Sequence, residues 1–181
     1  MRSKVSSKDS IIEVAEKIFK QDGIEGLKVR NISKRTGIAL GTIYNYFSSQ
    51  EELIEEVFVL SWTKTIHRLE KITNSSLPTK EKLHDFFNQL NTDILDRKGI
   101  GDFVLSKILF VKSFENSKYE FFRDIASLLE EILKEAQINR NINKKALNTS
   151  SQLVLIGFFN FRRQSTEKFN SYKELIINKF I

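Results

Sequence analysis

The chain has 181 residues, a length that suits one domain, or one small module on a larger body. Hydrophobic residues make up 40% of it, and its 15 Phe supply a bulky core. One Pro and seven Gly favour a mostly helical protein, and the absence of Cys excludes disulfides, a thiolate nucleophile and a zinc ribbon. The net charge is +6, and residues 1–50 carry nine Lys or Arg against five Asp or Glu. This excess at the amino-terminal end suits binding to phosphates, although a solvated basic face explains the charge equally well.

Targeting signals are not recognisable in the sequence. No apolar run approaches the roughly 18 residues that a membrane span requires. The first ten residues, MRSKVSSKDS, lack the apolar segment of a signal peptide. Together with the absence of Cys, these features predict a cytoplasmic protein.

Apolar residues recur at helical spacing over about residues 8–22 and predict a first helix there. Five of them share its buried face: Ile11, Ile12, Ala15, Ile18 and Phe19. Gly23 follows and ends the helix, because glycine disfavours a helix interior and tolerates the backbone of a turn.

Two shorter helices joined by a tight turn are predicted next, over about 29–36 and 40–47. Gly37 stands where a left-handed residue closes the first of them. Ile43 and Phe47 lie four residues apart on the buried face of the second. A short helix, a glycine turn and a second short helix with polar side chains outward are typical of a helix-turn-helix, whose second helix enters the DNA major groove.

The rest of the chain predicts further helices. Ser49 and Glu52 form a capping box, S-x-x-E, that opens a long helix to about Thr73. Later helices are expected over about 79–98, 102–113, 117–138, 144–164 and, from a second capping box at Ser171 and Glu174, 172–181. We therefore expect an all-α fold of about nine helices, with a three-helix helix-turn-helix module over 1–48 and a helical body over 49–181.

About the first 55 residues resemble the Tet repressor family of bacterial transcriptional regulators. The resemblance rests on the helix that ends at Gly23, on residues 29–37, on GTIYNYF at 41–47 and on Ser49–Leu53. It implies that residues 1–48 bind double-stranded DNA and that residues 49–181 bind a ligand and form a homodimer. The remaining residues match the family only in being helical and of suitable length.

The resemblance also implies DNA contacts at particular residues. Arg30, near the start of the first short helix, can reach a phosphate or read guanine through two hydrogen bonds. The other candidate DNA-binding residues lie in or beside the second short helix: Leu40, Gly41, Thr42, Tyr44, Asn45, Tyr46 and Gln50. The alternative for Tyr44 and Tyr46 is simple packing against the long helix that follows.

Three positions depart from the family pattern. Ala39 and Leu40 stand where the family often has Ser and then Lys, and Gln50 stands where Lys is common. Ala39 removes a helix cap worth about 1 kcal/mol, and the other two positions lack cations for phosphates. Leu40 can instead contact a thymine methyl group. The geometry of the motif is preserved.

The middle of the chain is rich in Phe with a few polar residues between. An apolar cavity with few polar groups is typical of small-molecule sites. The resemblance favours a pocket for a small hydrophobic or aromatic effector, and a filled aromatic core is the alternative. The candidate ligand-binding residues are Trp62, His84, Phe87, Phe103, Phe110 and Phe122.

The predicted helix over 144–164 is the candidate dimer interface, paired with the last helix of the chain. Its candidate residues are apolar or small on adjacent faces: Leu153, Ile156, Gly157, Phe159 and Asn160. Glycine inside a helix costs about 1 kcal/mol relative to alanine, which suggests that another helix approaches closely. Two-fold symmetry would match a palindromic operator.

The function predicted is a ligand-responsive repressor that a small effector releases from its operator. The first alternative is a co-activator that has lost DNA binding and acts through protein partners. The second is a helical enzyme, but no Ser-His-Asp set, glycine-rich phosphate loop or carboxylate pair is present, so we expect none. His67 and His84 have no partners at ligand spacing, so we expect neither a metal nor a cofactor.

Overall fold

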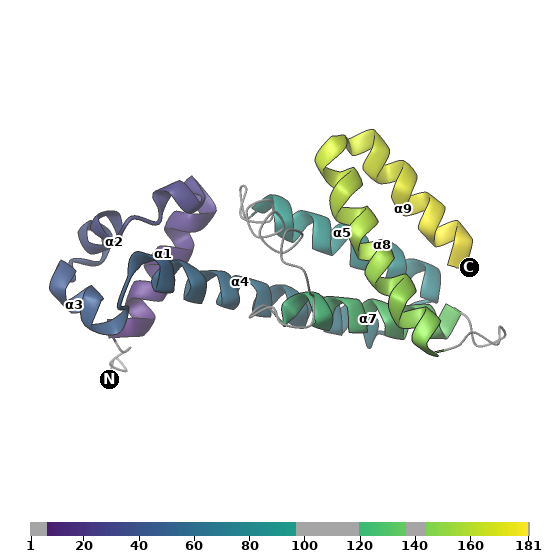
Figure 1. Ribbon diagram of the computed structural model, residues 1–181, viewed down its shortest axis with the longest axis horizontal. Coiled ribbons are helices and arrows are strands. Elements are labelled where there is room, and N and C mark those ends of the chain that lie inside the picture. Colours follow the sequence, from purple (N-terminus) through teal and green to yellow (C-terminus); the bar gives the residue numbers. More distant parts are fainter. Residues whose placement is uncertain (1–6, 97–119, 137–143, 181) are drawn as a thin grey trace. The chain divides into compact units, whose positions relative to one another are not determined.

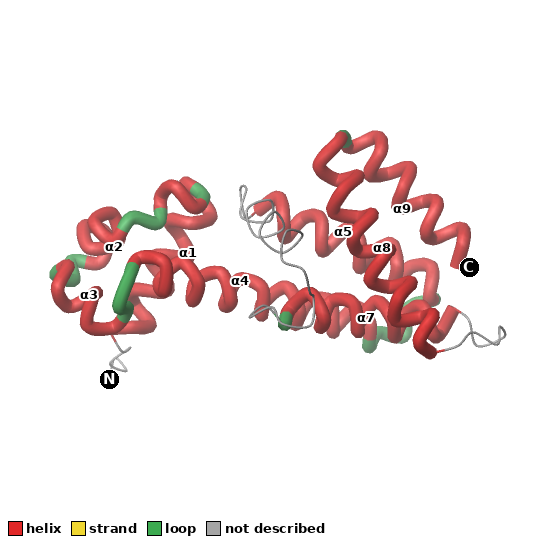
Figure 2. Tube along the Cα trace, in the orientation of Figure 1, coloured by secondary structure: helices red, strands yellow, loops and turns green. Residues whose placement is uncertain are grey.

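A computed structural model describes residues 7–96, 120–136 and 144–180 of the chain. Every element in these ranges is helical, and short loops join most of them (Figure 2). The α-helices are α1 (Ser7–Asp22), α2 (Val29–Thr36), α3 (Leu40–Tyr46), α4 (Gln50–Thr73), α5 (Thr79–Asp96), α7 (Phe121–Ala136), α8 (Lys144–Gln164) and α9 (Thr166–Phe180), and a short 3-10 helix spans Ile24–Gly26. The predicted all-α fold is confirmed. The helix expected over 102–113 lies outside the described residues.

The chain divides into two compact units. Met1–Lys64 and Asp93–Glu115 form the first, and Thr65–Thr92 and Asn116–Ile181 form the second. The division falls within α4, so this helix contributes residues to both units. The division by role, 1–48 and 49–181, remains a prediction. Among the described helices, none combines the length and the apolar character that a membrane span needs.

The first unit gathers α1, α2 and α3 around the first part of α4 (Figure 1). The residues fully buried in its core are Ile11, Ile18, Phe19, Leu27, Ile32, Ile43, Phe47 and Leu53. With eight and seven residues, α2 and α3 are too short to be stable in isolation. Their structure therefore depends on burial in this core.

Two ion pairs hold α1 beside α4. Lys8 donates to Glu56 at 2.7 Å, and Lys64 donates to both carboxylate oxygens of Glu16 at 2.6 Å. In both pairs the α4 residue lies 48 positions after its α1 partner, so the two helices run side by side in the same direction. Glu16 is largely buried, and its pairing offsets the cost of removing a carboxylate from water.

Phenylalanine rings form the centre of the second unit. Phe158 of α8 stacks on Phe87 of α5 with ring centroids 5.7 Å apart, and it meets Phe169 of α9 edge-on at 5.2 Å. Phe159 joins Phe158 to Phe122 of α7, both at 5.3 Å. These separations are those of favourable ring pairs, so one continuous aromatic cluster links α5, α7, α8 and α9.

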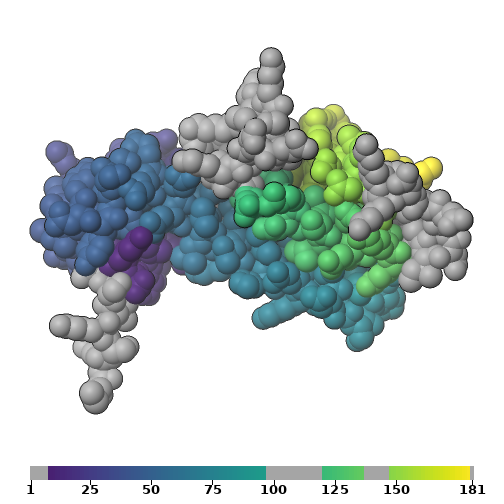
Figure 3. All heavy atoms as spheres, turned by 60° about the horizontal axis from the view of Figure 1, so that its bottom comes forward, coloured from purple at the N-terminus to yellow at the C-terminus, as the bar shows by residue number. Residues whose placement is uncertain are grey.

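A buried lysine also links helices of this unit. Lys82 of α5 is 5% exposed, and its ammonium lies 2.9 Å from both carboxylate oxygens of Glu135 on α7. The same ammonium donates to the Thr73 carbonyl at the end of α4 at 2.9 Å. Figure 3 shows α7 in green along the blue-green atoms of the preceding helices. Because Lys82 satisfies an otherwise free helix-end carbonyl, it fixes the turn between α4 and α5.

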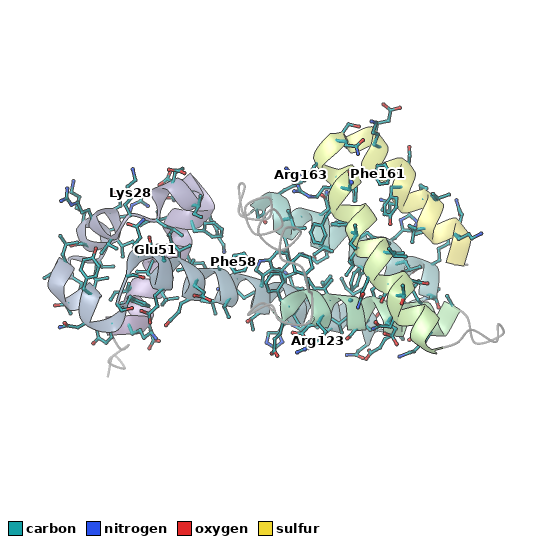
Figure 4. The ribbon with its side chains drawn as sticks, in the orientation of Figure 1. Lys28, Glu51, Phe58, Arg123, Phe161 and Arg163 are labelled. Atoms are coloured by element: carbon teal, nitrogen blue, oxygen red, sulfur yellow. The ribbon has the colours of Figure 1, made fainter. Side chains whose placement is uncertain are left out.

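Helices α8 and α9 pack closely through Gly157 and Tyr172. The Tyr172 hydroxyl donates to the Val154 carbonyl at 2.7 Å, and its ring stacks on Phe161 (labelled in Figure 4) with ring centroids 4.9 Å apart. A Cβ atom at Gly157 would lie 2.5 Å from Tyr172 Cζ and closer still to the hydroxyl oxygen. Burial raises the pKa of Tyr172 to about 12. The close approach expected at Gly157 is therefore made within the chain.

The start of α9 differs from the prediction. The helix begins at Thr166, and the Ser165 hydroxyl accepts a hydrogen bond from the Lys168 N–H at 3.1 Å. Ser171 and Glu174 lie inside the helix, so the second capping box was wrong. A cap requires non-helical backbone, whereas Phe169 here packs into the aromatic cluster and extends the helix towards its amino end.

Replacing Gly157 with alanine tests the approach of α8 and α9. We expect Gly157→Ala to lower the free energy of unfolding by about 1–3 kcal/mol, because the added methyl group collides with Tyr172. Gly41→Ala is the control, since a Cβ there meets nothing within 4 Å, and helix propensity should stabilise it by about 0.5–1 kcal/mol. Urea unfolding measures both. Equal effects at the two glycines would contradict this account.

Candidate nucleic-acid interface

The turn between α2 and α3 has the geometry expected of a helix-turn-helix. Gly37 adopts the left-handed conformation, with φ 71°, and its N–H donates to the Ser33 carbonyl at 2.9 Å. Ile43 and Phe47 are buried, so they fix which side of α3 faces the core. The left-handed turn predicted at Gly37 is confirmed.

The opposite side of α3 is open to solvent. Tyr44 is 50% exposed, and Leu40 and Tyr46 are each 39% exposed. Thr42 and Asn45 are also exposed. Both tyrosines therefore lie on the surface of the first unit.

The helix before the turn carries exposed cationic side chains. Lys28, Arg30 and Lys34 are exposed on α2 or at its start (Lys28 is labelled in Figure 4). Arg35 has a structural role instead, since its guanidinium donates to Gln21 at 2.7 Å and to Asp22 at 3.3 Å and thereby holds α2 on α1. Together α2 and α3 expose cations, hydroxyls and apolar groups, which are the groups that contact phosphates and base edges.

The start of α4 fixes the other end of α3. The Ser49 hydroxyl accepts from the Glu52 N–H at 3.1 Å, as the capping box predicts. The Glu52 carboxylate accepts from the N–H of Ser48 at 2.6 Å and from its hydroxyl, one residue before the usual partner. The hydrogen bond from the Ser48 side chain lowers the pKa of Glu52. Gln50, half-buried, is the first residue of α4.

Comparison with known proteins agrees with this geometry. Residues 11–57 match the profile of "Bacterial regulatory proteins, tetR family". The HTH-type transcriptional regulator PksA of Bacillus subtilis (strain 168) is 36% identical over 73 residues, which are 40% of this chain and 36% of that protein. The crystal structure of a TetR transcriptional regulator from Legionella pneumophila matches 100% of both chains with a TM-score of 0.70 at 23% identity. The helix-turn-helix module of this chain is of the TetR family.

Two further matches extend the comparison. The fatty acid metabolism regulator protein of B. subtilis is 31% identical over 83 residues, 46% of this chain and 43% of that protein. The crystal structure of FadR from B. subtilis in complex with stearoyl-CoA has a TM-score of 0.60 at 19% identity over 94% of this chain and 98% of that chain. The matched residues span about two fifths of the length of the first curated relatives. The structural matches establish the fold alone.

The predicted ligand-binding residues are divided between the two units. Trp62 is buried in the first unit with its ring edge-on to Phe58 at 6.0 Å. Phe87 and Phe122 are buried in the aromatic cluster of the second unit, and His84 lies there half-buried, 3.8 Å from Glu174. Phe103 and Phe110 lie outside the described residues. In the part of the chain that is described, no His, Cys, Asp or Glu cluster is arranged to hold a metal.

The predicted interface residues of α8 face different ways. Leu153 is 61% exposed, and Ile156 and Asn160 are also exposed. Phe159 is buried in the aromatic cluster, and Gly157 faces Tyr172. On α9, Leu175 is 64% exposed, and sequence reasoning missed it. The sequence marks it only as a Leu on the same side of α9 as the exposed Lys179, and an apolar residue among polar ones is too common a pattern to single out.

The Glu52 cap predicts a pH-dependent difference in stability. Because the folded state lowers the Glu52 pKa, its carboxylate stabilises the fold above the unfolded-state pKa, and this contribution is lost as pH falls through the folded-state pKa. Glu52→Gln should therefore be less stable than wild type near neutral pH, with a gap that narrows in acid. Urea unfolding across the acid range measures this. Glu51→Gln, in the same helical turn, is the control, and a gap independent of pH would contradict the assignment.

Proposed function

We propose that this protein is a DNA-binding transcriptional regulator that acts as a homodimer and, in its simplest form, as a repressor released from a palindromic operator by a small hydrophobic ligand. One observation carries the proposal. Ile43 and Phe47 hold one side of α3 in the core, and this leaves Thr42 and Tyr44 exposed to solvent. A recognition helix needs this arrangement to enter a major groove.

The individual contacts proposed follow from chemistry. Arg30 reads a guanine or binds a phosphate, and the hydroxyls of Thr42, Tyr44 and Tyr46 bind phosphates. Leu40 contacts a thymine methyl group, because an exposed apolar side chain stands there in place of a cation. Gly41 leaves open space in which DNA can approach the helix, and Asn45 and Gln50 contact the groove or the DNA backbone.

The homodimer is proposed to form through α8 and α9. These helices pack against each other and expose Leu153, Ile156 and Leu175. Large exposed apolar side chains on adjacent helices support burial against a second copy, which would form a four-helix interface. A two-fold dimer would present two α3 helices to half-sites about 34 Å apart, or a multiple of that distance.

The effector proposed is a small molecule with a hydrophobic part, held in the second unit. The aromatic side chains of that unit support this, as does the related FadR structure, which contains stearoyl-CoA. Ligand binding in the second unit would act on the helix-turn-helix through α4, the helix that contributes residues to both units. By linkage, effector and operator would each weaken the binding of the other.

A salt series with the full chain tests DNA binding. Fluorescence anisotropy would compare duplex DNA from upstream of the protein's own coding sequence with a shuffled duplex. We expect a preference for the native duplex and an affinity that falls with salt, with a slope of about −0.9 for each phosphate contacted. Arg30→Ala combined with Tyr44→Phe should weaken binding by about tenfold or more. Lys17→Ala, an exposed cation on α1 paired with Glu13, should change little.

A flat salt response, or equal binding of both duplexes, would contradict DNA binding. In that case, binding of a protein partner that the Arg30→Ala, Tyr44→Phe variant retains would favour the co-activator. The neutral side chains at Ala39, Leu40 and Gln50 are the observation that keeps this second candidate.

Introducing negative charge at the exposed leucines tests the dimer. We expect Leu153→Glu with Leu175→Glu to convert a dimer to a monomer in sedimentation experiments and to weaken operator binding, because four carboxylates would then meet at the interface. Val59→Glu, which changes an exposed apolar residue of α4, is the control and should leave the dimer intact. A dimer that survives the double substitution would place the interface elsewhere.

A further inference from the structure

Helix α3 begins without a side-chain cap. The N-cap residue is Ala39, with extended backbone at φ −61° and ψ 144°, and its side chain makes no capping hydrogen bond. Ser, Thr, Asp or Asn normally provides that bond. The first turn is about half of a seven-residue helix, so an uncapped start leaves much of α3 weakly held.

Two hydroxyls of α2 hold the turn instead. The Ser33 hydroxyl donates to the Ile38 carbonyl at 2.7 Å, and the Ile38 N–H donates to the Thr36 hydroxyl oxygen at 3.2 Å. The Thr36 hydroxyl in turn donates to the Ile32 carbonyl at 2.8 Å. Both backbone polar groups of Ile38, the residue directly before Ala39, are therefore bonded to side chains of the preceding helix.

We propose that Ser33 and Thr36 are positioning residues that set the start of the recognition helix and replace its missing cap. They act through Ile38 and are not assigned a contact with DNA. The proposal rests on the proposed function in one respect, since it assumes that α3 reads DNA. The clasp, meaning the bonds from Ser33 and Thr36 to Ile38, can nevertheless be measured in the free protein.

The position of the clasp explains why it matters. The carboxyl end of α3 is fixed by Ile43 and Phe47 in the core, but the other end follows Gly37, whose backbone is permissive, and Ala39, whose side chain makes no bond. Without the clasp, the first turn can tilt about its buried end. That turn carries Leu40, and helix-turn-helix proteins contact bases with the first residues of the recognition helix.

Ordinary helix chemistry accounts for only part of this network. A Thr hydroxyl that donates to the carbonyl four residues earlier is common inside helices, and the bond from Thr36 to Ile32 is of that kind. The Ser33 bond is different, because it spans five residues and crosses the left-handed Gly37 to reach the turn. It has no role in completing α2, so it serves the turn.

Hydrogen exchange in the full chain tests the clasp directly. Ser33→Ala and Thr36→Val remove the hydroxyls, and Ser33→Thr and Thr36→Ser are matched controls that keep them. We expect the amides of Ile43 and Tyr44 to exchange about five- to tenfold faster in the first pair, as the loss of one hydrogen bond allows, with α1 amides unchanged. If the α3 amides of Ser33→Ala and Thr36→Val exchange at the wild-type rate, or if exchange is faster by the same factor throughout the first unit, the proposal is overturned. Two independent hydroxyl deletions guard against a variant that fails to fold.

Restoring the missing cap gives a sharper test. Ala39→Ser should supply a hydrogen bond to the first turn of α3. Ser33→Ala should therefore increase the exchange of the α3 amides less in the Ala39→Ser background than in wild type. The same increase in exchange in both backgrounds would overturn the compensation between clasp and cap. Rescue by Ala39→Ser is a result that general destabilisation by Ser33→Ala would not give.

Operator affinity connects the clasp to function. We expect Ser33→Ala to weaken binding of the native duplex by about fivefold or more and Ala39→Ser to restore most of it, while Ser33→Thr remains near wild type. If wild-type protein shows no preference for that duplex, the proposed function fails, and the exchange measurements still decide the clasp. Unchanged affinity in a variant with faster α3 exchange would overturn the role in DNA reading.

Discussion

Burial of Ile43 and Phe47 is the constraint on which the helix-turn-helix of this protein depends. A seven-residue helix does not persist in water, so α3 exists because these two side chains, four residues apart, are buried where α3 packs against α1 and α2. The same enclosure decides which residues are left outside. Thr42 and Tyr44 face solvent because the helix has no other way to bury its apolar pair.

The two ends of α3 are held by different means. Its carboxyl end has the core and the capped start of α4, where Ser48 and Ser49 bond with Glu52. Its amino end has no cap of its own, and hydroxyls from α2 take that place at Ile38. The ion pairs of α1 with α4 and of Arg35 with the end of α1 brace the surrounding helices. A short helix is thus positioned chiefly by bonds from its neighbours.

Aromatic packing and the ion pair of Lys82 with Glu135 organise the second unit. Its rings contact one another from α5 to α9, and Lys82 supplies a buried polar link that also completes the end of α4. Gly157 permits Tyr172 to lie against the α8 backbone. That contact is made inside the chain, and Leu153, Ile156 and Leu175 remain exposed on the helix pair.

The sequence by itself determined the local elements. Helical periodicity and glycine turns predicted α1, α2 and α3 to within a residue or two, and the capping box at Ser49 marked the start of α4, because these signals act over one or two helical turns. Only the tertiary structure decided how faces meet. The S-x-x-E pattern at Ser171 was indistinguishable from a true cap until Phe169 was seen in the core, and Phe159 and Leu153 looked equivalent although one is buried and one exposed. Likewise, Ser33 was an ordinary helix residue until the turn brought Ile38 to its hydroxyl, since such partners are chosen by the folding of the chain in three dimensions and not by spacing along it.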